Sequence, residues 1–130
     1  MAMSVSHWGM KFDHVSVSVS DLDVARRFYC DVLRFNQIER PDFGFDGVWL
    51  EMSGTPVHLT TGGATPGPER PLRPNHPHFA VTLGVEPEEF LQHLKAHGVD
   101  GHELKDSPAA RWQYFVADPD GNMIEFCVYN

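Results

Sequence analysis

Apolar and polar side chains alternate with a period of two in the stretch FDHVSVSV at residues 12–19. Valine residues occupy one face of this stretch, and the other face carries His14 and two serines. The same alternation recurs in HFAVTL at residues 78–83, where His78 lies opposite the apolar face. Because successive side chains of a strand point to opposite faces, both stretches are predicted to be half-buried strands that carry a histidine on the polar face.

The stretch YFVADPDGNMIEFCVY at residues 114–129 predicts a β-hairpin. Its central DPDG, residues 118–121, suits a tight turn, since proline fixes φ and glycine accepts a left-handed conformation. In the second strand, Glu125 lies on the face opposite Ile124 and Phe126. An ionised carboxylate among apolar neighbours is costly unless it is paired, exposed to water or bound to a metal.

Two other stretches have apolar side chains at helical spacing, residues 22–33 and a segment from Pro87 to Gly98. Ser20 and Asp23 have the spacing of a capping box before the first helix, and Pro87 suits the first position of the second. Short segments rich in β-branched and aromatic residues and bounded by turn residues predict further strands. These strands are residues 36–40, 47–52, 56–61 and 102–104.

The chain contains an internal repeat on either side of a proline- and glycine-rich linker at residues 62–75, which is expected to be extended. A first module at residues 12–61 and a second at residues 76–130 both read strand, helix, strand, strand, strand. Matching His14 with His78 gives a period of about 64 residues, and His58 then corresponds to Glu125. The prediction is one α+β domain, residues 1–130, built from two equivalent modules.

The repeat places one candidate ligand on the first and the last strand of each module. If the modules face each other across a pseudo-twofold axis, His14, His58, His78 and Glu125 converge in one cup whose opposite wall packs against the helices. Imidazoles with a carboxylate suit a divalent ion, namely Zn, Ni, Co, Mn or Fe, with one or two positions open for water or substrate. The alternative is that these are ordinary structural or solvent-facing strand residues.

Composition narrows the classes of partner. The formal charge is −8 and the sequence pI is about 5.3. The sequence therefore does not predict a basic surface that would bind nucleic acid or an anionic membrane. No stretch approaches the roughly 20 apolar residues of a membrane span, and the beginning of the chain does not resemble a signal peptide. Two distant cysteines, Cys30 and Cys127, suit buried thiols in a reducing compartment. A cytoplasmic protein with a small-molecule substrate is expected.

With these residues in place, the chain resembles the vicinal oxygen chelate superfamily, which includes glyoxalases, bleomycin resistance proteins and extradiol dioxygenases. The resemblance covers residues 12–130 and is strongest in FDHVSVSVSDLDVARRFYCDVLRF, HFAV and YFVADPDGNMIEF. It implies paired βαβββ modules in an open, cup-shaped mixed sheet with helices outside, usually in a homodimer. It also implies metal ligation by the residues that match the family's ligand positions, His14, His78 and Glu125.

His58 departs from this resemblance, because glyoxalase I enzymes carry at its position a glutamate that both ligates and moves protons. A histidine can do either, so His58 or Glu125 is the expected proton shuttle. The resemblance then implies a metal-dependent lyase or isomerase of glyoxalase type. Its substrate would offer two adjacent oxygens and react through a metal-stabilised enediolate. Loss of the anionic ligand would favour an anionic substrate.

Two other functions stay open. An extradiol-type dioxygenase would hold Fe(II) with His14, His78 and Glu125, although those enzymes resemble two fused copies of this domain and carry a tyrosine where this chain has Phe115. A metal-free binding protein of the bleomycin resistance type would hold an aromatic ligand in a dimer groove lined by tryptophans and other aromatic side chains. The candidate substrate-binding residues are Trp49, Arg111 and Trp112.

Overall fold

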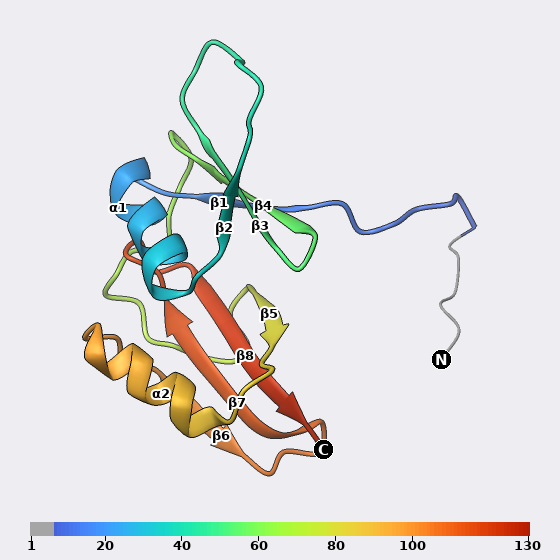
Figure 1. The fold of residues 1–130 in the computed structure, drawn as a ribbon, viewed down its shortest axis with the longest axis vertical. Coiled ribbons are helices and arrows are strands. Elements are labelled where there is room, and N and C mark those ends of the chain that lie inside the picture. Colours follow the sequence, from blue (N-terminus) through green and yellow to red (C-terminus); the bar gives the residue numbers. More distant parts are fainter. Residues whose placement is uncertain (1–6) are drawn as a thin grey trace.

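The computed structural model describes residues 7–130, which form two mixed sheets of four strands each, with helices on one side of the molecule (Figure 1). The first sheet has the order β1-β4-β3-β2, and the second has the order β5-β8-β7-β6. In each sheet the two strands at one end are parallel and the other pairings are antiparallel. The α+β class and the two modules expected from the sequence are confirmed, and the sheets do not close into a barrel.

The strands of the first sheet are β1 (Val15–Ser18), β2 (Asn36–Ile38), β3 (Val48–Met52) and β4 (Thr55–Thr60). Those of the second are β5 (His78–Thr82), β6 (His102–Lys105), β7 (Ala110–Ala117) and β8 (Met123–Tyr129). Each predicted strand is therefore present, with ends that differ by a few residues. The segment at residues 61–77 contains turns but no helix or strand, as its prolines and glycines require.

Strand register shows that the repeat is structural. Ser16 pairs with His58 between β1 and β4, and Ala80 pairs with Glu125 between β5 and β8. Since Ser16 follows His14 by two residues and Ala80 follows His78 by two, each histidine lies on the same face as its partner from the last strand. The two modules thus offer equivalent positions, one pair on each sheet.

The first helical segment differs from the single helix that its sequence predicts. It begins as α1 (Leu22–Arg27) and continues as a π-helical turn, η1 (Phe28–Val32). The N-cap is Asp21, whose side chain accepts a hydrogen bond from the Val24 N–H, so the expected cap at Ser20 is wrong. Ser20 instead donates its backbone N–H to Asp120, a long-range contact that local spacing could not reveal.

The second helix, α2 (Pro87–Ala96), begins and ends close to its predicted limits. Pro87 occupies the first turn, where a missing N–H costs nothing, and Glu88 and Glu89 lie at the positive end of the helix dipole. A single hydrophobic core joins both modules and is formed by the helix-facing sides of the sheets. Its fully buried members include Tyr29, Leu50, Leu59, Leu94, Val116 and Ile124.

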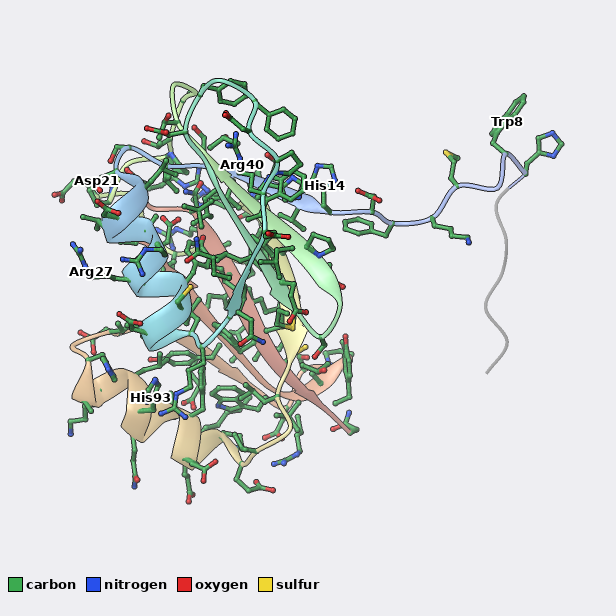
Figure 2. The ribbon with its side chains drawn as sticks, turned by 45° about the horizontal axis from the view of Figure 1, so that its top comes forward. Trp8, His14, Asp21, Arg27, Arg40 and His93 are labelled. Atoms are coloured by element: carbon green, nitrogen blue, oxygen red, sulfur yellow. The ribbon has the colours of Figure 1, made fainter. Side chains whose placement is uncertain are left out.

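Residues 7–14 lie apart from the rest of the molecule. This segment extends away from the sheets on the side opposite the helices, with Trp8 near its end and His14 where it meets β1 (Figure 2). Trp8 and Phe12 are 80% and 82% exposed. No helix in the described part of the chain is long and apolar enough to cross a membrane.

Candidate metal and substrate site

His78 and Glu125, which we call the second half-site, lie next to each other on β5 and β8. His78 Nε2 is 3.0 Å from Glu125 Oε1, and the two side chains are 21% and 12% exposed. Glu125 Oε2 accepts a hydrogen bond of 3.1 Å from the Gln113 amide on β7. The amide thus fixes one carboxylate oxygen and leaves the other directed at the imidazole.

The hydrogen bonds of His78 define what this pair can bind. Its Nδ1 lies 2.7 Å from the His76 carbonyl oxygen, which only accepts, so Nδ1 carries a proton. In a neutral ring, Nε2 is then an acceptor that faces a second acceptor, the Glu125 carboxylate. This contact is favourable only when a proton or a metal ion is held by both atoms.

The first half-site, His14 and His58, has a different arrangement. The His14 and His58 rings stack with centroids 4.1 Å apart and planes at 24°, and Trp49 stacks on the other face of His58 at 4.1 Å and 5°. Lone pairs of imidazole nitrogens lie in the ring plane, so two stacked rings direct them side by side. His14 and His58 therefore bind one ion together only if one ring leaves the stack.

The two histidines of the first half-site also differ in hydrogen bonding. His14 Nδ1 lies 2.6 Å from an Asp13 carboxylate oxygen, which fixes the ring through Nδ1, as the His76 carbonyl does for His78. Burial is the largest cause that lowers the pKa of His58, and the neighbouring His14 adds to it. His58 is thus held between two rings as a neutral imidazole at neutral pH, suited to accept a proton.

The two half-sites do not merge within one chain. Among residues 7–130, no three histidine, cysteine, aspartate or glutamate side chains come close enough to hold a metal ion. His14 and His78 nevertheless line the same cavity, of about 700 Å³, between the β1 and β5 regions. The convergence of all four candidate ligands stays a prediction, and the two pairs are what the chain itself forms.

Residues outside the half-sites complete the wall of this cavity. β1 contributes Ser16 and Ser18, the turn before β8 contributes Asn122, and the linker contributes Thr65 and Arg70. The linker is fixed here because the Gly67 N–H donates to the Asp120 carbonyl at 2.8 Å. A cavity of this size and composition is typical of small-molecule sites.

Buried hydrogen bonds at the hairpin turn hold this wall in place. Asp118 is 3% exposed and accepts from the Asp120 and Asn122 N–H groups, the Tyr29 hydroxyl and the Asn122 amide. Burial raises the pKa of Asp118, and these four bonds partly oppose that effect. The Asn122 amide also donates to the Ser18 carbonyl at 2.8 Å, which ties the end of β1 to the hairpin.

The three predicted substrate-binding residues have different outcomes. Trp49 lies against His58 on the open face of the first sheet, as described. Trp112 does not lie at the half-sites: it has the same strand parity as Tyr114 and Val116, which places its ring on the helix side, where it is 4% exposed and bonded to Glu103. Arg111 does not join the half-sites either, because its guanidinium pairs with Glu86 at 3.2 Å.

Sequence reasoning missed two residues of the site. Gln113 has the same strand parity as Phe115, which pairs with Glu125, so the hairpin register contains the signal for its contact with Glu125. Arg70, on the linker, is the second of these residues. Its place in the cavity wall depends on the docking of the linker against the hairpin, for which the sequence holds no local signal.

Comparison with known proteins gives one family. A sequence model of the Glyoxalase/Bleomycin resistance protein/Dioxygenase superfamily matches residues 11–126. The Arabidopsis thaliana protein named glyoxylase I 4 is 31% identical over 128 residues, which cover 88% of this chain and 68% of the plant protein.

Solved structures show the same fold. A Bacillus anthracis protein assigned to the glyoxalase family superposes with a TM-score of 0.77 at 23% identity, with both chains covered completely. The fosfomycin resistance protein FosX from Listeria monocytogenes superposes with a TM-score of 0.74 at 18% identity, over 100% of this chain and 94% of that one. At these identities the structural matches establish the fold and leave the reaction open.

Proposed function

Because the chain belongs to the glyoxalase/bleomycin resistance protein/dioxygenase superfamily, we propose that it is a metal-dependent lyase or isomerase of the glyoxalase type. Its substrate is a small molecule with two adjacent oxygen atoms. The observation that carries this proposal is the contact between His78 Nε2 and Glu125 Oε1, an imidazole nitrogen and a carboxylate oxygen that lie 3.0 Å apart and are both suited to bind a divalent ion.

The donor set fits a divalent transition ion. His78 and Glu125 supply an imidazole and a carboxylate, and each has its other polar atom engaged, by the His76 carbonyl and by Gln113 respectively. His14, whose Nδ1 is engaged by Asp13, is the third donor in this proposal. A bound ion would polarise a substrate carbonyl and lower the cost of removing a proton from the neighbouring carbon.

His58 has the role of proton acceptor in this scheme. The stack with Trp49 and His14 holds its ring, and its lowered pKa keeps it neutral and basic at neutral pH. A base in a fixed orientation contributes to the rate through both geometry and protonation state. Trp49 acts as a wall that keeps His58 in place.

Elemental analysis of the purified chain tests the metal. We expect about one equivalent of a divalent ion per chain, because a site with three protein ligands holds its ion through purification. A His78→Ala, Glu125→Ala double variant should lose it. The matched control is His97→Ala, Glu88→Ala, which changes the same residue types at exposed positions, the C-cap and the first turn of α2. Gln113→Ala should weaken the ion's affinity by about 10- to 100-fold by freeing Glu125.

Two outcomes would count against a metal-dependent enzyme. One is a chain that takes up no divalent ion when ions are added at neutral pH. The other is a double variant that binds the ion as tightly as the control.

The aromatic stack supports a second candidate function, binding of an aromatic ligand without a metal. The ring centroid of Phe43 lies 6.0 Å from that of Trp49 and 5.8 Å from that of Phe45. The row of rings formed by His14, His58 and Trp49 therefore continues into the exposed rings of Phe43 and Phe45. A planar ligand could extend this row by stacking. If this function holds, Trp49→Leu should weaken the binding of aromatic ligands. The measurement uses protein that has been treated with a chelator to remove any metal.

A further inference from the structure

The lining of the cavity between the β1 and β5 regions differs in charge from the chain as a whole. The chain carries a formal charge of −8, yet none of the described residues that line this cavity is an aspartate or glutamate. Its lining does include one arginine, Arg70, and the two histidines His14 and His78. Each of these histidines lies against a carboxylate, His14 against Asp13 and His78 against Glu125, so Arg70 is the one cation in the described lining that has no carboxylate beside it.

Arg70 is a cation held in place and left without an anion. Within residues 7–130, its guanidinium forms no ion pair and no hydrogen bond, and the residue is only partly exposed. Its backbone is fixed, since the Arg70 N–H donates to the Gly67 carbonyl and the Gly67 N–H donates to the Asp120 carbonyl. A partly buried charge without a partner is costly, and a bound anion removes that cost.

Ser18 supplies a second observation in the same cavity. Its hydroxyl oxygen is buried and has no hydrogen-bond partner among the described residues. Buried hydroxyls are nearly always hydrogen-bonded, so an unpaired one in the wall of a cavity marks the place of a missing partner. The Asn122 amide fixes the Ser18 backbone, so this hydroxyl is on a rigid strand end.

We propose that this cavity binds an oxyanion group of the substrate, a carboxylate or a phosphate, between the Arg70 guanidinium and the Ser18 hydroxyl. The inference deepens the proposed function and rests on it for the identity of the ligand as substrate. It gives the substrate class as a small oxygen-rich acid whose reacting oxygens lie toward the proposed metal ligands. Arg70 and Ser18 are binding residues that determine specificity.

The test is a titration of the ¹⁵N-labelled full chain, followed by amide chemical shifts, at constant ionic strength. Glycolate and methylphosphonate are the anionic probes, and glycolamide is the neutral probe of matched size. We expect the anions to bind and glycolamide to bind at least about tenfold more weakly, as for loss of a charged hydrogen bond. A response to glycolate alone assigns the site to carboxylates, and a response to methylphosphonate alone assigns it to phosphates.

Variants then assign the binding to these residues. Arg70→Gln should weaken anion binding about tenfold and Ser18→Ala several-fold, while Arg70→Lys should retain part of it. Arg73→Gln, which removes an exposed arginine three residues along the same linker, is the control and should bind as the wild type does. The inference is overturned if no probe binds, if glycolamide binds as well as glycolate, or if Arg70→Gln matches the control.

A final arm separates this inference from the metal. In the His78→Ala, Glu125→Ala variant, anion binding that still depends on Arg70 supports the cavity even if elemental analysis finds no metal in the wild type. Conversely, consider the case in which the wild type holds its metal while anion binding does not depend on Arg70. That result leaves the proposed function intact and refutes the anion site.

Discussion

At the scale of single residues, position on a strand face decides chemistry more than residue type does. His14, His58 and His78 are all strand histidines on the open faces of the sheets. His14 and His78 each have Nδ1 bonded to an oxygen, which leaves Nε2 as the acceptor atom, whereas His58 is enclosed between two rings. This difference supports the proposal that His14 and His78 ligate the ion and that His58 accepts the proton.

The pKa of His58 gives a prediction for stability. Because this pKa is lower in the folded chain than the ordinary value of 6.5, protonation of His58 favours the unfolded state. The contribution of His58 to the free energy of unfolding is complete above pH 6.5 and is lost as the pH falls through the folded-state pKa. We expect His58→Gln to reduce the loss of stability on acidification.

Urea unfolding at a series of pH values, in the presence of a chelator, measures this effect. His58→Phe is the informative second variant, since it keeps a ring in the stack but does not titrate. If both variants lose stability with pH as steeply as the wild type, the proposed state of His58 is wrong.

At the scale of elements, the hairpin turn organises the chain, because it holds three other segments. Tyr29 from η1 donates to Asp118, the Ser20 N–H donates to Asp120, and Gly67 from the linker donates to the Asp120 carbonyl. Gly121 permits the last contact: its φ is +88°, and a Cβ at this position would overlap the Gly67 carbonyl.

Gly121→Ala should therefore destabilise the chain by about 1–3 kcal/mol from backbone strain, with a further cost from displacement of the linker. Gly54→Ala is a matched control for strain alone, since Gly54 has a φ of +84° and open space around it. Gly84→Ala, with neither feature, should change little. Thermal unfolding of the three variants measures the difference, and equal costs for Gly121 and Gly54 would show that the linker contact carries no energy.

Much of this element-level structure was predictable because it is encoded locally. The alternation around Val15 and Val17, the DPDG turn and the match of His58 with Glu125 all depend on periods of the chain itself. The missed features depend on distant partners. Asp21 caps α1 while Ser20 bonds to the hairpin, and Arg70 is placed by the docked linker. Trp112, by contrast, faces the core by ordinary strand alternation with Tyr114 and Val116.

At the scale of the whole molecule, each chain forms two separate half-sites and leaves features suited to a partner. The strands β1 and β5 each end a sheet, and the segment at residues 7–14 extends away from the body with Trp8 and Phe12 exposed. We propose that the working form is a homodimer in which each metal site combines the first half-site of one chain with the second half-site of the other.

Mixing two defective chains tests this arrangement. His14→Ala impairs only the first half-site, and the His78→Ala, Glu125→Ala variant impairs only the second. After refolding an equal mixture, half-sites shared between chains should restore about a quarter of an equivalent of metal per chain, since half of the dimers contain one intact site. If the half-sites combine within one chain, the mixture should bind no metal. A monomer in sedimentation analysis would also contradict the proposed dimer.

The docked linker gives the cavity two kinds of wall. The proposed metal-binding residues are on or beside paired strands, whereas Arg70 is on a linker that is joined to the hairpin mainly by backbone atoms. Backbone contacts tolerate exchange of side chains at neighbouring positions. Substrate preference in such a protein can therefore diverge by replacement of one loop while the reaction chemistry is inherited unchanged, and a library confined to residues 64–75 is the direct route to new specificities.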